Sequence, residues 1–165
     1  MRFANPFLHT IEIVYRFLIM IGSNLESLFL LYMRVTWGQQ LMNRGWAKLH
    51  AIENTEEFFA LVNISHSHFN AYMVGWFELI GGFCLFVGFA SRIAAVPIAI
   101  IMLIALSTAH APDISNFRYL LEPLSVAKQA PYPFLITAIL IFTFGPGRIS
   151  IDGWLKRWAE KRPKY

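Results

Sequence analysis

Seventeen consecutive residues without a charge or a histidine, residues 93–109, constrain the fold of this chain more than any other feature. As a helix they would be about 26 Å long, which is close to the thickness of the hydrocarbon core of a bilayer. The composition agrees, since 56% of the 165 residues are hydrophobic and 15% are charged, against about 25% charged in soluble domains. It excludes a disordered regulator, a secreted disulfide scaffold and a nucleic-acid-binding domain with a broad basic face. We therefore expect an integral membrane protein.

Three further segments are apolar enough to cross a membrane. Residues 70–91 are interrupted only by Glu78, and residues 27–48 contain Arg34 and become polar toward their end. Residues 131–149 begin with Pro131 and Pro133, which suit the first turn of a helix because an N–H there has no intrahelical partner. The sequence thus predicts an all-α membrane protein, a bundle of four transmembrane helices, and leaves no room for a second domain.

The segment 7–21 has a different pattern. It is too short to cross a bilayer comfortably, and its polar residues His9, Glu12 and Arg16 fall on one helical stripe. We expect an amphipathic helix that lies in the membrane interface. A secretory signal is the alternative, but charges interrupt the apolar run and no A-x-A cleavage pattern follows it. The chain then divides into an interfacial helix (1–24), a transmembrane domain (25–153) and a basic tail (154–165).

The distribution of lysine and arginine predicts the topology. With four spans, nine of these residues lie on the side of both termini and four on the other. The positive-inside rule then places both termini in the cytoplasm of a bacterial inner membrane and the connections 49–69 and 110–130 outside. The first connection also has the pattern of a short surface helix over residues 55–62. Residues 148–165 carry the whole net charge of +4, and so short a basic segment suits anionic lipid headgroups rather than nucleic acid.

Two charges within the predicted spans mark the candidate site. A charge costs about 2.5–3.5 kcal/mol at the centre of a membrane helix, so it persists mainly when it is paired or faces a polar interior. Glu78 lies among glycines on its helix, and Arg34 shares a stripe of small and cationic residues with Lys48. If residue 78 is level with about residue 40, Arg34 is the preferred partner of Glu78, with Arg44 or Lys48 as the alternative. The pair would either fix helix register or form a polar pocket that binds a quinone-like headgroup or carries a proton.

Histidines add one candidate donor and a weak metal hypothesis. His110 would end the third span about 9 Å outward of Glu78, where it is either a proton donor or an ordinary interfacial histidine. His50, His66, His68 and His110 share the outer side, but their spacing is not that of a metal site, so no metal centre is predicted. The single cysteine, Cys84, excludes dithiol exchange within the chain.

Four sequence pieces together resemble the DoxX family of small four-helix membrane proteins. They are LLYMRVTWGQQLMNRGWAKL (30–49), VGWFELIGGFCLFVGFASR (74–92), the helix that ends at His110, and GPGRISID (145–152). The family takes its name from a subunit of a thiosulfate:quinone oxidoreductase, and relatives are associated with membrane redox complexes and oxidative-stress defence. The N-terminal 24 residues have no counterpart in this resemblance, and Pro131 and Pro133 stand where relatives often have a polar or acidic residue.

The resemblance implies a membrane subunit of a redox complex, linked to sulfur-compound oxidation or oxidative-stress defence. The site predicted for this chain contains Glu78 as hydrogen-bond and proton acceptor, Arg34 or Lys48 as counter-ion and His110 as donor. The expected cofactor is a quinone, and the expected partners are the lipid bilayer and either a redox subunit or a second copy of the chain. The alternatives are a scaffold or assembly factor without chemistry, and a pathway for a small solute or a proton.

Overall fold

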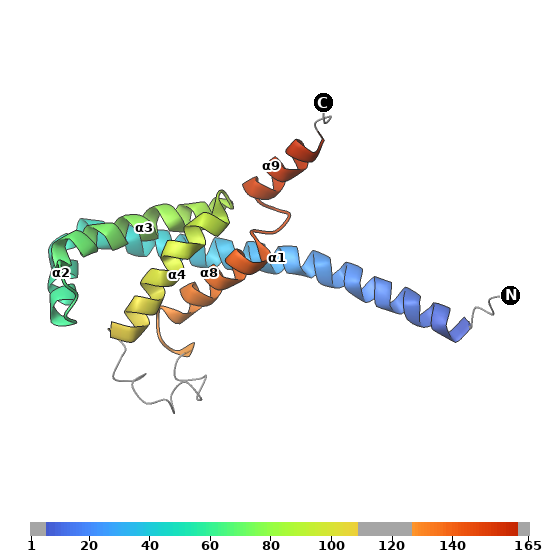
Figure 1. Ribbon diagram of the computed structural model, residues 1–165, viewed down its shortest axis with the longest axis horizontal. Helices are drawn as coiled ribbons and strands as arrows, with labels where there is room; N and C mark the ends of the chain where they lie inside the picture. Colours follow the sequence, from blue (N-terminus) through green and yellow to red (C-terminus); the bar gives the residue numbers. More distant parts are fainter. Residues whose placement is uncertain (1–5, 109–126, 162–165) are drawn as a thin grey trace.

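The computed structural model of the protein describes residues 6–108 and 127–161, with side chains from residue 11 onward. Within these ranges the structure is entirely helical. Its helices are α1 (Pro6–His50), α2 (Ile52–Leu61), α3 (Ser67–Val87), α4 (Ser91–Thr108), α8 (Tyr132–Phe144) and α9 (Ile151–Glu160). Helices α3, α4 and α8 gather around the C-terminal half of α1, and its N-terminal half projects away from them (Figure 1). Helix α9 lies at the end of the bundle from which this half projects (Figure 1).

Helix α1 runs without a break through the predicted boundary near residue 24. The sequence predicted two helices, over 7–21 and 27–48, but the structure has one continuous helix of 45 residues. The segment between them contains no proline and a single glycine, Gly22, whose cost of about 1 kcal/mol does not break a helix. At 1.5 Å per residue α1 is about 67 Å long, roughly twice the hydrocarbon thickness. The placement of residues 7–21 on the membrane surface stays a prediction.

Glycines bring α1 and α3 into close antiparallel contact. A Cβ atom built on Gly45 would lie 2.7 Å from the carbonyl oxygen of Gly75, and one on Gly82 would lie 2.7 Å from the backbone nitrogen of Met42. A Cβ on Gly38 would likewise meet the backbone nitrogen of Phe86 at 2.9 Å. Such backbone approach, typical of small residues in membrane helices, holds residues 38–45 of α1 against residues 75–86 of α3. The glycine stripes read from the sequence therefore face each other.

The core lies where α4 and α8 meet the α1–α3 pair. Its buried side chains include Leu41, Leu85, Ile98, Phe134 and Ile141. Most other large apolar side chains of the long helices point outward, as expected for helices whose surroundings are hydrocarbon. Three described helices, α1, α3 and α4, are long and apolar enough to cross a membrane, and α8 is apolar but has only 13 residues. The predicted spans over 70–91 and 93–109 correspond to α3 and α4, and the predicted surface helix over 55–62 corresponds to α2.

Candidate functional site

Glu78 is the only acidic side chain buried in the described part of the bundle. It is 2% exposed and lies midway along α3, where Gly45, Gly75 and Gly82 let α1 approach. The Nζ atom of Lys48 on α1 donates a hydrogen bond to Oε1 of Glu78 at 2.5 Å. The other carboxylate oxygen, Oε2, is buried and has no hydrogen-bond partner among the described residues. The pair thus neutralises the charge and leaves one strong acceptor unused.

The counter-ion of Glu78 is Lys48, which the sequence offers as an alternative. The preferred prediction, that Arg34 pairs with Glu78, is wrong. The expected register placed residue 78 level with about residue 40, whereas the backbone of Gly45 packs against Gly75 to Leu79. This shift of about five residues moves Lys48 toward Glu78 and Arg34 away from it by about 7–8 Å. The connection between α1 and α3 contains α2, so the position of one helix relative to the other does not follow from connection length alone.

A cavity of about 710 Å³ opens beside the ion pair. Its walls come from the C-terminal end of α1, from α2, α3 and the second half of α4. Lys48 and Glu78 are at its inner wall together with Arg44, whose guanidinium lies 4.7 Å from the centre of the Phe134 ring. Most of the remaining lining is apolar, including Phe58, Phe59, Val74, Phe77, Ile101 and Ile104. The size and this mixture of apolar walls with a few convergent polar groups are those of a small-molecule site.

The predicted donor His110 lies outside the described residues, so its place in the site stays a prediction. Of the other histidines that the sequence places on the same side, His68 pairs with Glu56 at 2.7 Å between Nδ1 and Oε2. His50 lies with its Nδ1 3.0 Å from the carbonyl oxygen of Trp46. In the described part of the chain no three histidine, cysteine or acidic side chains come together as metal ligands.

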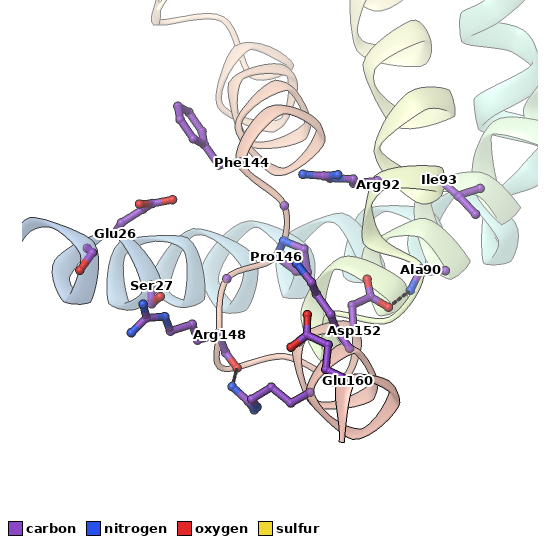
Figure 2. A pocket seen from close by; sticks show the side chains of 16 residues that line it. Glu26, Ser27, Ala90, Arg92, Ile93, Phe144, Pro146, Arg148, Asp152 and Glu160 are labelled. Carbon is purple, nitrogen blue, oxygen red and sulfur yellow. Dashed lines mark hydrogen bonds between the residues drawn. The ribbon is translucent and has the colours of Figure 1, made fainter. Parts of the chain in front are cut away.

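Arg34 belongs to a second polar cluster, at the other end of α3. Its Nη2 atom donates a hydrogen bond to the carbonyl oxygen of Ile149 at 2.5 Å. Asp152 accepts hydrogen bonds from the backbone N–H groups of Ala90 and Ser91 at 2.8 and 3.0 Å, and so caps the first turn of α4 (Figure 2). The N–H of Asp152 in turn donates to the carbonyl oxygen of Gly88 at 2.9 Å. These contacts fasten the α8–α9 linker onto α1 and onto the turn between α3 and α4.

Sequence reasoning missed the role of Asp152 in this cluster. The signal was its position as one of two acids in a basic C-terminal segment. Gly88 shows why the cluster needs its glycine: its φ of +75° is in the left-handed region, and a Cβ there would collide with Nη1 of Arg34. The pieces GFASR and GPGRISID are therefore joined in space, and their contacts hold the fold together.

The fold and the site define a class, a multi-pass helical membrane protein with a buried carboxylate–lysine pair beside a largely apolar cavity. The chain belongs to the DoxX family, whose model matches residues 29–111. It is 36% identical over 124 residues, which are 74% of this chain and 83% of the relative, to "Putative oxidoreductase CatD" of Bacillus subtilis (strain 168). No solved structure matches the chain significantly.

Proposed function

We propose that the protein is a membrane subunit of a redox complex and that the cavity beside Glu78 binds the headgroup of a quinone or quinol. The observation that carries the proposal is the unpartnered Oε2 of Glu78, a buried carboxylate oxygen at the wall of a largely apolar cavity. The family, and a relative named as an oxidoreductase, supply the redox context.

The residues present suit such a ligand. A quinone has an apolar ring, polar oxygens on opposite edges and a hydrocarbon tail, and when bound it supplies electron and proton transfer. When the ligand is the quinol, Glu78 would accept a hydrogen bond from a hydroxyl through Oε2; when it is the quinone, Lys48, which is 29% exposed, would donate one to a ring carbonyl. The aromatic rings of Phe58 and Phe77 would flank the quinone ring. The hydrocarbon tail of the quinone would extend from the cavity toward the lipid. Glu78 then holds or releases a proton as the ligand changes redox state.

The proposal includes the arrangement in the membrane. Four crossings in a bacterial inner membrane place both termini in the cytoplasm, a bend of α1 at the membrane surface lays its N-terminal part in the interface, and Glu78 is reached from within the bilayer. Electrons come from a partner redox subunit, or the chain acts as a homo-oligomer, in sulfur-compound oxidation or oxidative-stress defence. These points follow the family resemblance and the charge distribution of the sequence.

Quinone content measured by mass spectrometry tests the site. The protein is purified in lipid nanodiscs with a short-chain quinone that is kept reduced as the quinol, and Glu78→Gln is compared with Glu57→Gln, which changes an exposed carboxylate on α2. We expect bound quinol in the wild type and in Glu57→Gln, and at least a roughly tenfold loss in Glu78→Gln, because the carboxylate that accepts the hydrogen bond of a quinol hydroxyl is removed.

Two results would contradict the proposal. Equal quinone content in all three proteins, with lower thermal stability of Glu78→Gln, would show that the ion pair serves packing and would favour a scaffold. A proton or solute flux across proteoliposomes that disappears in Glu78→Gln, without any quinone binding, would favour a transport pathway.

A further inference from the structure

A second cavity, of about 690 Å³, lies at the opposite end of the bundle from the one beside Glu78. It is bounded by α1, the start of α4, the α8–α9 linker and α9 (Figure 2). The two cavities share no lining residue, so what binds in one does not depend on the proposed function of the other.

Cations outnumber carboxylates by one in the lining of this second cavity. Four of them line it: Arg92, Arg148, Lys156 and Arg157. Three carboxylates also line it, but both oxygens of Asp152 already accept backbone hydrogen bonds, which leaves Glu26 and Glu160. Among the described residues, neither the ammonium group of Lys156 nor the guanidinium of Arg148 has a hydrogen-bond or ion-pair partner. These two cations are therefore free for an anion, whereas Arg157 and Arg92 each donate one hydrogen bond to a backbone carbonyl oxygen.

Apolar side chains lie next to these donors. Ile93, in the first turn of α4, is 77% exposed, and Phe144, the last residue of α8, is 58% exposed. The side chain of Arg92 lies between α4 and the end of α8, with its Nη2 atom 3.4 Å from the position of a Cβ on Gly145 (Figure 2). Because α3, α4 and α8 all begin or end at this level, hydrocarbon and water meet here when the bundle is in a bilayer.

Helix α9 also indicates that this end of the bundle lies at the membrane interface. Its apolar residues Ile151, Trp154, Leu155 and Trp158 recur at the spacing of one helical face, and all are exposed. Lys156 and Arg157 lie off this stripe and line the cavity. An exposed apolar stripe with tryptophans beside a cationic face is the pattern of a helix that lies in the membrane interface.

Because cations and exposed apolar side chains lie side by side at this level, we infer that the second cavity is a binding site for the phosphate of an acidic phospholipid. The phosphate is held by Arg148 and Lys156, with Arg92 and Arg157 beside it, and the acyl chains run along Ile93 and Phe144. A zwitterionic lipid is disfavoured because its headgroup brings a positive charge toward the cations. A free phosphate ion satisfies the donors but leaves the apolar wall unused.

Lipid retention in native mass spectrometry tests this site. The full-length protein is taken from nanodiscs that contain equal amounts of phosphatidylglycerol and phosphatidylcholine. We expect phosphatidylglycerol to be retained preferentially by the wild type, and on the order of tenfold less by a double variant with Arg148→Gln and Lys156→Gln, because two interfacial cations are removed. Lys161→Gln, which removes a cation of the same segment that does not line the cavity, is the matched control and should retain the lipid.

A second variant, which keeps every cation, distinguishes loss of the lipid site from loss of lipid through misfolding. Glu26→Gln removes an exposed carboxylate from the cavity and should increase the retention of phosphatidylglycerol. The inference is overturned by equal retention of the two lipids, or by an equal loss in Lys161→Gln, which would indicate general charge attraction. Displacement of the lipid by millimolar inorganic phosphate with no preference between headgroups would point to a soluble anion and would also overturn it.

Discussion

Gly22 and Gly45 lie in the same helix but in opposite surroundings, which makes them a matched pair for substitution. No atom lies within 4 Å of a Cβ on Gly22, whereas one on Gly45 would press on the backbone of Gly75 and Glu78. We expect Gly45→Ala to lower stability by about 1–3 kcal/mol, the usual cost of overpacking, because the backbone of α3 must move away. Gly22→Ala should leave stability unchanged or raise it by up to about 1 kcal/mol.

Thermal unfolding of the two variants in one detergent measures this difference. A side chain on Gly45 would also displace Glu78 from Lys48, so the loss of stability should be accompanied by weaker quinone retention. If Gly45→Ala unfolds at the same temperature as Gly22→Ala, the close contact between α1 and α3 does not exist in solution.

The candidate site could be predicted only in part at the level of single residues. The sequence identified Glu78 as the buried acid because a lone carboxylate among glycines on an apolar helix needs a polar neighbour. It offered Arg34 and Lys48 as counter-ions but ranked them wrongly, since helix register depends on which backbone atoms meet at Gly45 and Gly82. The capping role of Asp152 joins residues 61 and 62 positions apart, a separation that no local pattern reveals.

At the scale of elements, hydropathy predicted α3 and α4 to within a few residues because both are long, apolar and bounded by breaks in the helix. Gly88 ends α3 in a left-handed conformation, and Ser91 begins α4 three residues later. The predicted break near residue 24 of α1 has no such signal, and the helix continues through it. The sequence thus predicts the ends of helices correctly where a residue type forces the backbone to turn. It predicts them wrongly where only a change in amphipathicity suggests a boundary.

The N-terminal part of α1 should be dispensable for the fold of the bundle. From residue 11 to residue 26 every side chain is exposed except that of Ser23, which is half-buried, and the first buried one is Ser27. We expect deletion of residues 2–20 to leave the thermal midpoint in detergent unchanged. As a positive control, Leu30→Ala should lower stability by about 2–5 kcal/mol, because Leu30 is 2% exposed.

Thermal unfolding followed by size-exclusion chromatography compares the deleted protein with the wild type. A truncated protein that aggregates, or that loses as much stability as Leu30→Ala, would show that the projecting half of α1 packs against the bundle or against a second copy.

At the scale of the whole molecule, the short helix α8 decides the topology. Its 13 residues span only about 20 Å, less than the hydrocarbon thickness. The hydrogen bonds of Asp152 to the start of α4 nevertheless return the chain to the level at which α4 began. Local thinning of the bilayer or the flanking linker can accommodate a short span at a modest cost. The chain beyond α8 is therefore expected on the side of the membrane opposite to the turn between α2 and α3.

Two engineered cysteines separate the possible topologies. In a Cys84→Ser background, Ser65→Cys lies in the exposed turn before α3 and Lys161→Cys lies at the end of α9. If α3, α4 and α8 all cross, the two positions are on opposite sides, and a membrane-impermeant maleimide added to intact spheroplasts should label Ser65→Cys and should label Lys161→Cys only after permeabilisation. If α8 does not cross, only two helices separate the cysteines, and both are labelled from the same side. That result would remove the fourth crossing and would separate α9 from the start of α4, so the cationic cavity, which both helices line, would not form.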